Sequence, residues 1–348
     1  MLVQSNTCSG EDAEMIQVGI AGYGWWGRHI LNRLQGNDVL KATVVAEPIT
    51  DLHNDIVKAG AEAVAELDQL LARPDLDAII LTTPHMFHEE QVARCAAAGK
   101  HVFCEKPLGM SGKSAARSVE ACKSAGVILG IGHERRFEPA MVRLKEMLAQ
   151  GELGTIMHAE AAFSHNKLVG VPDGSWRTSK QDSPGAGMTG MGIHLTDLFI
   201  WMFGSVASVQ AQTRDRLLGW GTGDMVVAQL GFAEGMTASL QAILATPHFM
   251  RFHVFGSQGW VEIRNDTHPD TPGGKTHFIR ADVEGKQTEE SLDWSDAVVA
   301  NLEAFAHAVE GKAPYPWTDQ QLIHNIEVFE AIVASADSGE TVRLGNPT

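Results

Sequence analysis

Short apolar runs alternate with longer amphipathic segments over the first third of the chain, from Met15 to about Gly132. Runs of consecutive apolar residues are typical of strands that are buried on both faces of a parallel sheet. We therefore predict strands at Met15–Ala21, Ala42–Ala46, Ala78–Thr82, His101–Cys104 and Val127–Gly130. The amphipathic segments predict helices at Gly27–Leu34, Asp51–Ala59, Glu89–Ala98 and Ser111–Ser124. This alternation predicts an α/β domain of the Rossmann type, a parallel sheet with helices on both faces.

The pattern changes after Gly132. Pro139 near the start of an apolar periodic stretch and Gly151 just beyond it predict a helix at Glu138–Gln150. Strand-like segments joined by short turns then predict a large, mostly antiparallel sheet. The strands are expected at Ile156–Phe163, Val206–Thr213, Met225–Phe232, Met236–Ile243, Arg251–Gly256 and Val261–Arg264, followed by helices at Ser295–Glu310 and Thr318–Ser335. The second half is therefore predicted to be an α+β domain.

These patterns divide the chain into three parts. Residues 1–14 are polar and have neither a basic start nor an apolar core, so we expect a disordered tail and no secretory signal. Residues 15–133 form the α/β domain, and residues 134–348 form the α+β domain. The last helix, 318–335, is long enough to pack back on the first domain.

Charge and cysteine content narrow the class of protein. A net charge of -16 argues against nucleic acid and against an anionic membrane surface, because both need a basic footprint. No apolar run approaches the roughly 18 residues of a membrane-spanning helix. The four cysteines form no CxxC pair, which favours a reduced cytoplasmic protein with free thiols. The 15 histidines form no HExxH motif or compact carboxylate–histidine cluster, so we expect no metal.

The first predicted strand and helix are joined by a glycine-rich turn of the form GxGxxG, from Gly22 to Gly27. Gly22 permits the tight turn, Gly24 lets the backbone approach a pyrophosphate, and Gly27 lets the helix and strand pack closely. The helix N-terminus adds free N–H groups and a positive dipole, with the amides of Trp25 and Trp26 as the expected phosphate contacts. The turn predicts that residues 15–133 bind a dinucleotide.

Glu47 lies twenty residues after Gly27, at the end of the second predicted strand. An acidic side chain there accepts hydrogen bonds from the adenosine ribose hydroxyls. It would also repel a 2′-phosphate, and no arginine follows it closely. The sequence therefore favours NAD over NADP as the cofactor.

A family resemblance adds to these predictions. Its motifs are the turn Gly22–Gly27, Thr83–His88, Gly99–Pro107, Arg136–Ala140, Gly151–Gly154, Trp176–Arg177 and Gly192–Asp197. With them the chain resembles the glucose–fructose oxidoreductase, inositol dehydrogenase and rhizopine-catabolism (Gfo/Idh/MocA) family. The resemblance covers about residues 17–204, and the rest more loosely. It implies hydride transfer between a nicotinamide and a secondary alcohol or ketone of a sugar, inositol or related cyclic polyol.

The same resemblance implies roles for single residues. It places Lys106 beside the nicotinamide and makes His194 an active-site histidine. It places further cofactor contacts at Thr83, Pro84, His88 and Glu105. It also makes the peptide bond between Lys106 and Pro107 a candidate cis bond, since cis bonds are essentially a property of proline.

The chemistry of hydride transfer requires residues of the same kinds. Hydride transfer from an alcohol leaves a proton to be removed, so a base must reach the carbinol oxygen. A histidine has a suitable pKa, and a lysine either acts as a base after its pKa is lowered or stays charged and polarises the carbonyl. Which of Lys106 and His194 is the base stays open. The structural alternatives are a solvated lysine at a strand end and a core histidine.

One position departs from the family pattern. Many members carry an aspartate four residues before this histidine, where this chain has Gly190. Asp197 lies one turn after His194 and is a candidate to orient the imidazole or bind substrate, or else pairs locally. The other candidates for the missing group are Thr189, Asp173 and Asp182.

Further residues are expected near the cleft. His133 and Arg135 follow the last predicted strand of the first domain, and they either line the pocket or belong to an interdomain hinge. Trp176 and Arg177 are candidates for a pocket wall, because an aromatic face packs well on the apolar side of a sugar. The alternative for Trp176 is a place in the core.

The predicted antiparallel sheet has a mixed strip on one face. It contains Met225, Val227, Gln229, Thr237, Ser239 and Gln241. A face of this kind is able to pair with another subunit, and we expect a homodimer or homotetramer through the sheet.

The main hypothesis is an NAD-dependent dehydrogenase that acts on a carbohydrate-like substrate. A second hypothesis is a non-catalytic NAD-binding regulator, since fold alone does not prove activity. A third is an enzyme that keeps NAD bound and uses a transient oxidation for elimination or hydrolysis.

Overall fold

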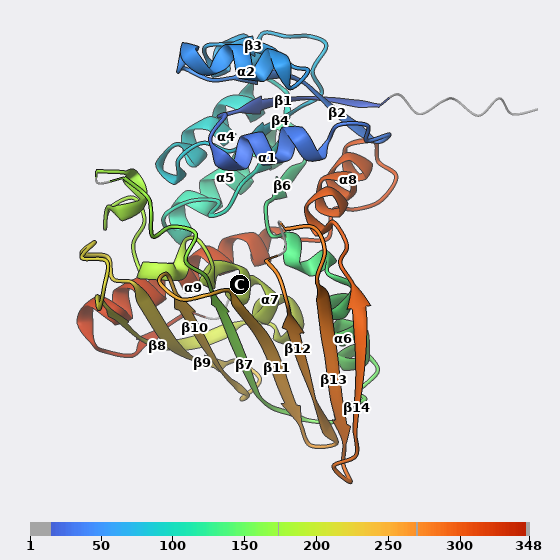
Figure 1. Cartoon of the computed structure of the whole chain (residues 1–348), viewed down its shortest axis with the longest axis vertical. Coiled ribbons are helices and arrows are strands. Elements are labelled where there is room, and N and C mark those ends of the chain that lie inside the picture. Colours follow the sequence, from blue (N-terminus) through green and yellow to red (C-terminus); the bar gives the residue numbers. More distant parts are fainter. Residues whose placement is uncertain (1–14, 173, 269–270, 346–348) are drawn as a thin grey trace, which may run out of the picture.

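The computed structural model describes residues 15–172, 174–268 and 271–345, and it contains two sheets stacked end to end (Figure 1). The first sheet has six strands in the order β3-β2-β1-β4-β5-β6, and the second has nine in the order β14-β13-β12-β11-β7-β10-β9-β8-β15. The predicted tail at 1–14 and the candidate Asp173 lie outside the described residues.

The first domain is the predicted parallel sheet with helices on both faces, and all its strand pairs are parallel. The five predicted strands are confirmed with small shifts of their ends. Its strands are β1 (Ile16–Ala21), β2 (Leu40–Ala46), β3 (Glu62–Val64), β4 (Ala78–Leu81), β5 (His101–Cys104) and β6 (Leu129–Ile131). Its helices are α1 (Trp25–Arg33), α2 (His53–Lys58), α3 (Leu67–Leu71), α4 (His88–Ala97) and α5 (Gly112–Ala125), with short 3-10 helices η1 (Thr50–Leu52) and η2 (His85–Phe87).

The sequence pattern missed β3 and α3. Strand β3 has only three residues, and none of them is fully buried. A strand this short at the edge of the sheet leaves no apolar run. Helix α3 has five residues, of which only Leu67 and Leu70 are buried, so it has too few turns for a periodic signal.

The second domain follows β6. Its helices are η3 (Glu134–Phe137), α6 (Pro139–Ala149), η4 (Trp176–Thr178), η5 (Ala186–Met188), α7 (Gly192–Phe203), α8 (Ala297–Val309) and α9 (Asp319–Ser338). Its strands are β7 (Ile156–Ser164), β8 (Val206–Arg214), β9 (Met225–Phe232), β10 (Thr237–Ile243), β11 (Phe249–Gly256), β12 (Gly259–Asn265), β13 (Lys275–Asp282), β14 (Gln287–Asp293) and β15 (Val342–Arg343).

The nine-stranded sheet is mostly antiparallel, as predicted, with one parallel pair between β7 and β10. Strands β13 and β14 were not predicted. In β14 six of the seven residues are exposed, so its sequence carries no alternation of apolar and polar residues. Pairing with β13 along its whole length makes it a strand.

Helices α6, α7 and α9 cover one face of this sheet (Figure 1). The strands alternate accordingly: in β9, Val226, Ala228 and Leu230 are buried, whereas Val227 and Gln229 on the opposite face are exposed. That opposite face is open and hollowed into a shallow groove. None of the described helices has the length and apolar character needed to cross a membrane.

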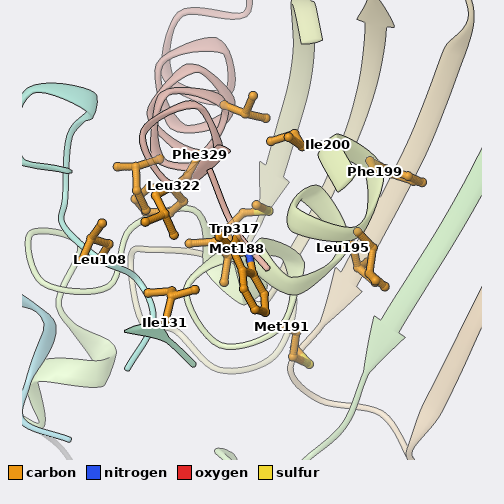
Figure 2. Close-up of a cluster of buried hydrophobic side chains, with 14 of the residues drawn as sticks. Leu108, Ile131, Met188, Met191, Leu195, Phe199, Ile200, Trp317, Leu322 and Phe329 are labelled. Atoms are coloured by element: carbon orange, nitrogen blue, oxygen red, sulfur yellow. The ribbon is translucent and has the colours of Figure 1, made fainter. Parts of the chain in front are cut away.

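The larger of two apolar clusters in the described residues extends through both domains. Leu108 and Ile131 of the first domain pack with Met191 and Leu195 around α7 and with Phe329 of α9 (Figure 2). Helix α9 also lies against α5, where the amide of Gly112 donates a hydrogen bond of 2.9 Å to the Glu330 carboxylate. Because the core is continuous, packing fixes the two domains relative to each other.

Candidate active site

The predicted phosphate turn has the expected geometry. Gly22 has φ of 97°, in the left-handed region that favours glycine, and its amide donates to the Ala46 carbonyl at 2.8 Å. Helix α1 begins at Trp25 directly after Gly24, with no side chain capping its first turn. The free N–H groups of that turn therefore remain available to a phosphate.

Each glycine of the turn is required for a different structural reason. A Cβ at Gly27 would lie 2.1 Å from the Gly22 carbonyl oxygen, so only glycine lets α1 pack on the turn. A Cβ at Gly24 would meet nothing within 4 Å, and its open space lies where the backbone must approach a ligand. The hydroxyl of Thr82, the residue after β4, holds the turn through hydrogen bonds to the carbonyls of Ala21 and Gly22.

Glu47 follows β2 and is buried beside this turn. One carboxylate oxygen accepts a hydrogen bond of 2.8 Å from the Tyr23 amide, and the other accepts one of 3.0 Å from the Ile49 amide. Each oxygen keeps a lone pair for a ribose hydroxyl. The residues of this region therefore fit the adenosine and pyrophosphate parts of a dinucleotide.

A cavity of about 590 Å³ extends from the phosphate turn into the second domain. Its walls from the first domain include Trp25, Trp26, Thr82, Thr83, His85, Glu105 and Lys106. Its walls from the second domain include Glu134, Phe163, His165, Lys167, Leu168, Val171, Trp176, Arg177, Gly190, His194 and His268. The predicted cofactor residues and predicted catalytic residues thus meet in one space.

Lys106 enters this cavity from the loop after β5. The Lys106–Pro107 peptide bond is cis, as predicted. The Lys106 ammonium Nζ donates hydrogen bonds to the backbone carbonyls of Gly190 at 3.1 Å and Thr189 at 3.3 Å, just before α7. Burial lowers the pKa of Lys106, although the carboxylates of Glu105 and Glu134 oppose this shift.

His194 enters the cavity from the first turn of α7 and is 4 % exposed. Its Nδ1 lies 3.7 Å from an oxygen of Glu134, and the ring meets that of His133 edge-on at 5.3 Å. Burial, together with the charge of Lys106, holds the pKa of His194 well below its usual value. The imidazole is therefore neutral at neutral pH and able to accept a proton.

The two carboxylates of the cavity have raised pKa values. Burial raises the pKa of Glu105 to about 7, against the effect of Lys106. Burial also raises the pKa of Glu134 to about 7, against the effect of Arg135. Strongly shifted groups gathered in one cavity are typical of a catalytic site.

The loops that carry Thr83 and Pro107 are tied together by His88. Its ring is fully buried, with Nδ1 2.7 Å from the Pro107 carbonyl oxygen and Nε2 3.0 Å from the Thr83 carbonyl oxygen. His88 therefore supports the cofactor loops from behind the cavity wall. Pro84 directly precedes η2, and Thr83 itself lines the cavity.

The structure gives Asp197 a different role from the one considered toward His194. Its carboxylate accepts two hydrogen bonds from Arg136, at 2.7 and 2.8 Å, and one of 2.9 Å from Trp317 Nε1. Burial alone would raise the pKa of Asp197, but Arg136 outweighs it and keeps the pKa below its usual value. Asp197 forms a buried ion pair that joins α7 to η3, which is the local pairing left open above.

The other candidates for the missing acidic group lie off the cavity surface. The Thr189 hydroxyl is buried against Ser183 at 2.6 Å, and only its backbone carbonyl reaches Lys106. The backbone amide of Asp182 bonds to Ser179, and its carboxylate is not among the cavity walls. At Gly190 itself a Cβ would meet only Leu168, at 3.9 Å, so the position is open.

His133 and Arg135 lie one layer behind the cavity. His133 is held by Asn325 at 3.0 Å and backs onto His194. Arg135 is fully buried, pairs with Glu138 at 2.8 Å and stacks over the ring of Phe163 at 4.0 Å. Both residues support cavity walls and do not form them.

Trp176 and Arg177 form part of the wall, as considered from the sequence. The Arg177 guanidinium stacks over the Trp176 ring at 4.3 Å, and that ring meets His85 edge-on at 4.5 Å. Arg177 has no carboxylate partner among the described residues. Burial lowers its pKa.

Sequence reasoning missed several wall residues. Glu134 and His85 were not among the residues predicted to line the cavity. His165, Lys167 and His268 come from loops whose positions depend on the whole second sheet, so no local signal marks them. Glu134 did have a signal, since it lies three residues beyond β6, near the carboxyl edge of a parallel sheet, where ligands bind. No group of three or more metal-ligand side chains is found in the described part of the chain.

Two family models match the chain. The model of the "Oxidoreductase family, NAD-binding Rossmann fold" matches residues 16–133, and that of the "GFO/IDH/MocA C-terminal domain" matches residues 141–262. Together they span well over half of the chain and define an oxidoreductase with an NAD-binding Rossmann domain. The chain belongs to the Gfo/Idh/MocA family.

Relatives resemble the chain over spans that range from about half to nearly all of its length. A 1,5-anhydro-D-fructose reductase of Ensifer adhaerens is 27% identical over 81% of this chain and 84% of the relative. The scyllo-inositol 2-dehydrogenase (NADP(+)) IolW of Bacillus subtilis is 24% identical over 95% of this chain and 96% of the relative. An uncharacterized oxidoreductase of Streptococcus pneumoniae is 30% identical, over 49% of this chain and 46% of the relative.

Solved structures share the fold. A putative NADPH-dependent oxidoreductase from Desulfitobacterium hafniense superimposes with a TM-score of 0.84 at 23% identity, covering 95% of this chain and 98% of the other. At this identity the match shows the two-domain architecture alone.

Proposed function

We propose that the protein is an NAD-dependent dehydrogenase of a secondary alcohol in a sugar, inositol or related cyclic polyol. The observation that carries the proposal is the meeting of Lys106 and His194 in one cavity that continues from the phosphate turn. Fold alone would support only nucleotide binding. Two groups suited to proton transfer beside that site support alcohol chemistry.

The nicotinamide supplies the hydride acceptor or donor when the cofactor is bound. His194 takes the carbinol proton, because its lowered pKa keeps the imidazole neutral. Lys106 donates hydrogen bonds to two backbone carbonyls, which fixes its ammonium where a carbinol or carbonyl oxygen is to be held. In the reverse direction the positive charge of Lys106 polarises the ketone, and the histidine returns the proton.

We propose NAD and not NADP as the cofactor. Glu47 is buried and held by two backbone amides, so its negative charge cannot easily turn away from a 2′-phosphate. IolW is named as an NADP(+) enzyme, so membership of the family does not fix the cofactor. The preference for NAD therefore rests on Glu47 of this chain.

The substrate class is supported by the cavity walls. Trp176 offers an aromatic face of the kind that stacks on a sugar ring, and Arg177 offers donors to oxygen atoms. Relatives named for 1,5-anhydro-D-fructose and scyllo-inositol lend the same class support.

The test is a panel of polyols, sugars and sugar acids with NAD, followed by NADH absorbance. Lys106→Ala is expected to lower kcat about 10²- to 10⁴-fold, the range typical of acid–base groups, with little change in the Kd for NADH. Lys100→Ala, a lysine that bonds to Arg73 and Leu76 carbonyls away from the cavity, is the control and should keep kcat.

The same panel separates the alternatives. Turnover unaffected by Lys106→Ala overturns the mechanism. Tight NAD binding with no NADH from any compound favours a non-catalytic regulator, and product formed without net NADH favours elimination or hydrolysis through transient oxidation.

We also propose a cytoplasmic homo-oligomer. The open face of the second sheet is a broad groove lined by residues such as Val227, Gln229 and Gln241, and faces of this size are commonly covered by another subunit. The described cysteines, Cys95, Cys104 and Cys122, are buried free thiols, which supports a reducing compartment.

A further inference from the structure

We infer that Glu134 is a positioning residue for His194: its carboxylate holds the Nδ1–H of the imidazole and so leaves Nε2 as the nitrogen that takes the carbinol proton. The inference rests on the proposed function. It assigns to Glu134 the role of the acidic group that is missing at Gly190.

The geometry places the two groups face to face. His194 Nδ1 lies 3.7 Å from Glu134 Oε2, and both side chains are nearly fully buried. Nδ1 is a buried nitrogen without any hydrogen bond in the structure. A hydrogen bond between these atoms requires about 2.7–3.2 Å, so a closure of less than about 1 Å satisfies the nitrogen.

Among the described residues, no other carboxylate lies within ion-pair distance of the His194 ring. Glu134 is the one acid within ion-pair distance of His194 among the described residues. Asp197, on the same helix, is fully engaged by Arg136 and Trp317. The other charged groups around His194, which are Lys106, Arg135 and the neighbouring histidines, are positive or neutral and lower its pKa.

The contact decides which ring nitrogen is the base. A neutral imidazole carries its proton on one nitrogen and a lone pair on the other, and a carboxylate beside Nδ1 favours the proton there. The lone pair then sits on Nε2. His133 packs edge-on against the ring at 5.3 Å and limits its rotation, so this assignment is kept.

The proton balance follows from this arrangement. As the hydride leaves the carbinol carbon, the carbinol O–H bond breaks and its proton passes to Nε2. The imidazolium that forms is paired with the Glu134 carboxylate. It returns the proton to water when the ketone leaves, or to the alkoxide when the reaction runs in reverse.

The pair joins two separate elements of the second domain. Glu134 is the first residue of η3, three residues after the end of β6, whereas His194 belongs to α7, sixty residues later in the sequence. The acid and the base therefore meet only when α7 packs against η3, and a motif search along the sequence does not connect them.

A tautomer measurement tests the inference without turnover. The enzyme is labelled with ¹⁵N-histidine, saturated with NADH and observed at pH 8, and the His194 signal is assigned by its loss in His194→Gln. The wild type is expected to show the tautomer in which Nδ1 is protonated and Nε2 is unprotonated. In Glu134→Leu the signal should change to the Nε2–H form, which unpaired imidazoles prefer, whereas Glu134→Asp should keep the wild-type form. The Nε2–H form in the wild type, or no change in Glu134→Leu, overturns the inference.

A double-mutant cycle tests it in catalysis. Glu134→Leu is expected to lower kcat about 10- to 100-fold, with the KM for substrate and the Kd for NADH within twofold of the wild type. In the His194→Gln background the same substitution should lose most of its effect, because the inferred role of Glu134 is exerted on His194. An equal loss in both backgrounds shows that Glu134 acts independently and overturns the inference, as does a parallel loss of NADH binding.

The two proposals fail in different ways. If no polyol or sugar yields NADH, the proposed function fails, while the ¹⁵N spectra still decide the role of Glu134. If NADH is formed and the tautomer does not depend on Glu134, the function stands and only the inference fails.

Discussion

The backbone amide of Tyr23, inside the phosphate turn, donates a hydrogen bond of 2.8 Å to the carboxylate of Glu47 at the end of β2. The residue predicted to bind the ribose therefore also fixes the loop that binds the pyrophosphate. Any substitution of Glu47 changes both functions together, which makes its effect larger than the loss of a ribose contact alone.

Replacing Glu47 tests the cofactor argument. Glu47→Ser is expected to raise the Kd for NAD about tenfold or more, because hydrogen bonds to a charged group contribute about 1.5–3 kcal/mol. Glu47→Arg should in addition admit NADP, since it replaces a repelling charge with an attracting one. Fluorescence titration with both cofactors measures the change, and an unchanged ratio of the two Kd values contradicts it.

Substitutions at two glycines of the turn are expected to have different effects, one on stability and the other on NAD affinity. Gly27→Ala places a Cβ 2.1 Å from a backbone oxygen and should cost about 1–3 kcal/mol of unfolding free energy or more, measured in urea. Gly24→Ala has open space around the new methyl and should keep its stability while losing NAD affinity about tenfold. Equal stability losses in the two variants would refute the distinction.

Glu134 should make the stability of the enzyme depend on pH. Burial raises its folded pKa to about 7 from 4.5, so its contribution to stability is complete below pH 4.5 and is lost as the pH rises through 7. Glu134→Gln does not titrate. Its unfolding free energy relative to the wild type should therefore increase between pH 4.5 and 7.5, by up to about 3 kcal/mol. Urea unfolding across this range measures it, with Glu284→Gln, at an exposed position, as the matched control substitution.

The open face of the second sheet should govern assembly. Val227→Glu puts a charge in the middle of the groove and is expected to shift the protein toward a 37.6 kDa monomer in light scattering. Val283→Glu is the matched control, because Val283 lies in the exposed β13–β14 turn, and it should keep the wild-type mass. A wild type that is already monomeric, or equal masses for both variants, rules out this interface.

Much of the first domain could be predicted because its signals are local. An apolar run such as Ala78–Leu81 and a turn such as Gly22–Gly27 carry their structure in a few neighbouring residues. Strand β14 has no such signal, because it owes its structure to pairing with β13. Its polar side chains would suit a loop equally well.

The residues of the site also differ in how far the sequence reveals their roles. Lys106 follows a buried strand and His194 starts an apolar helix, so a motif reveals both. The role of Asp197 was decided by Arg136 and Trp317, which lie 61 and 120 residues away from it in sequence. The importance of Glu134 likewise depends on His194, a partner sixty residues away in another helix. Such contacts are set by packing and are invisible to spacing along the chain.

The continuous core behind the site has a consequence for how the specificity of this enzyme can diverge. Leu108, two residues after Lys106, and Leu195, next to His194, are fixed in the same apolar packing. Trp176 and Arg177 instead belong to a short 3-10 segment that is only half-buried. Exchanges in that segment are therefore free to alter what the enzyme recognises while its reactive groups keep their alignment. Selection for a new substrate should accumulate changes there and spare the packed residues behind the lysine and the histidine.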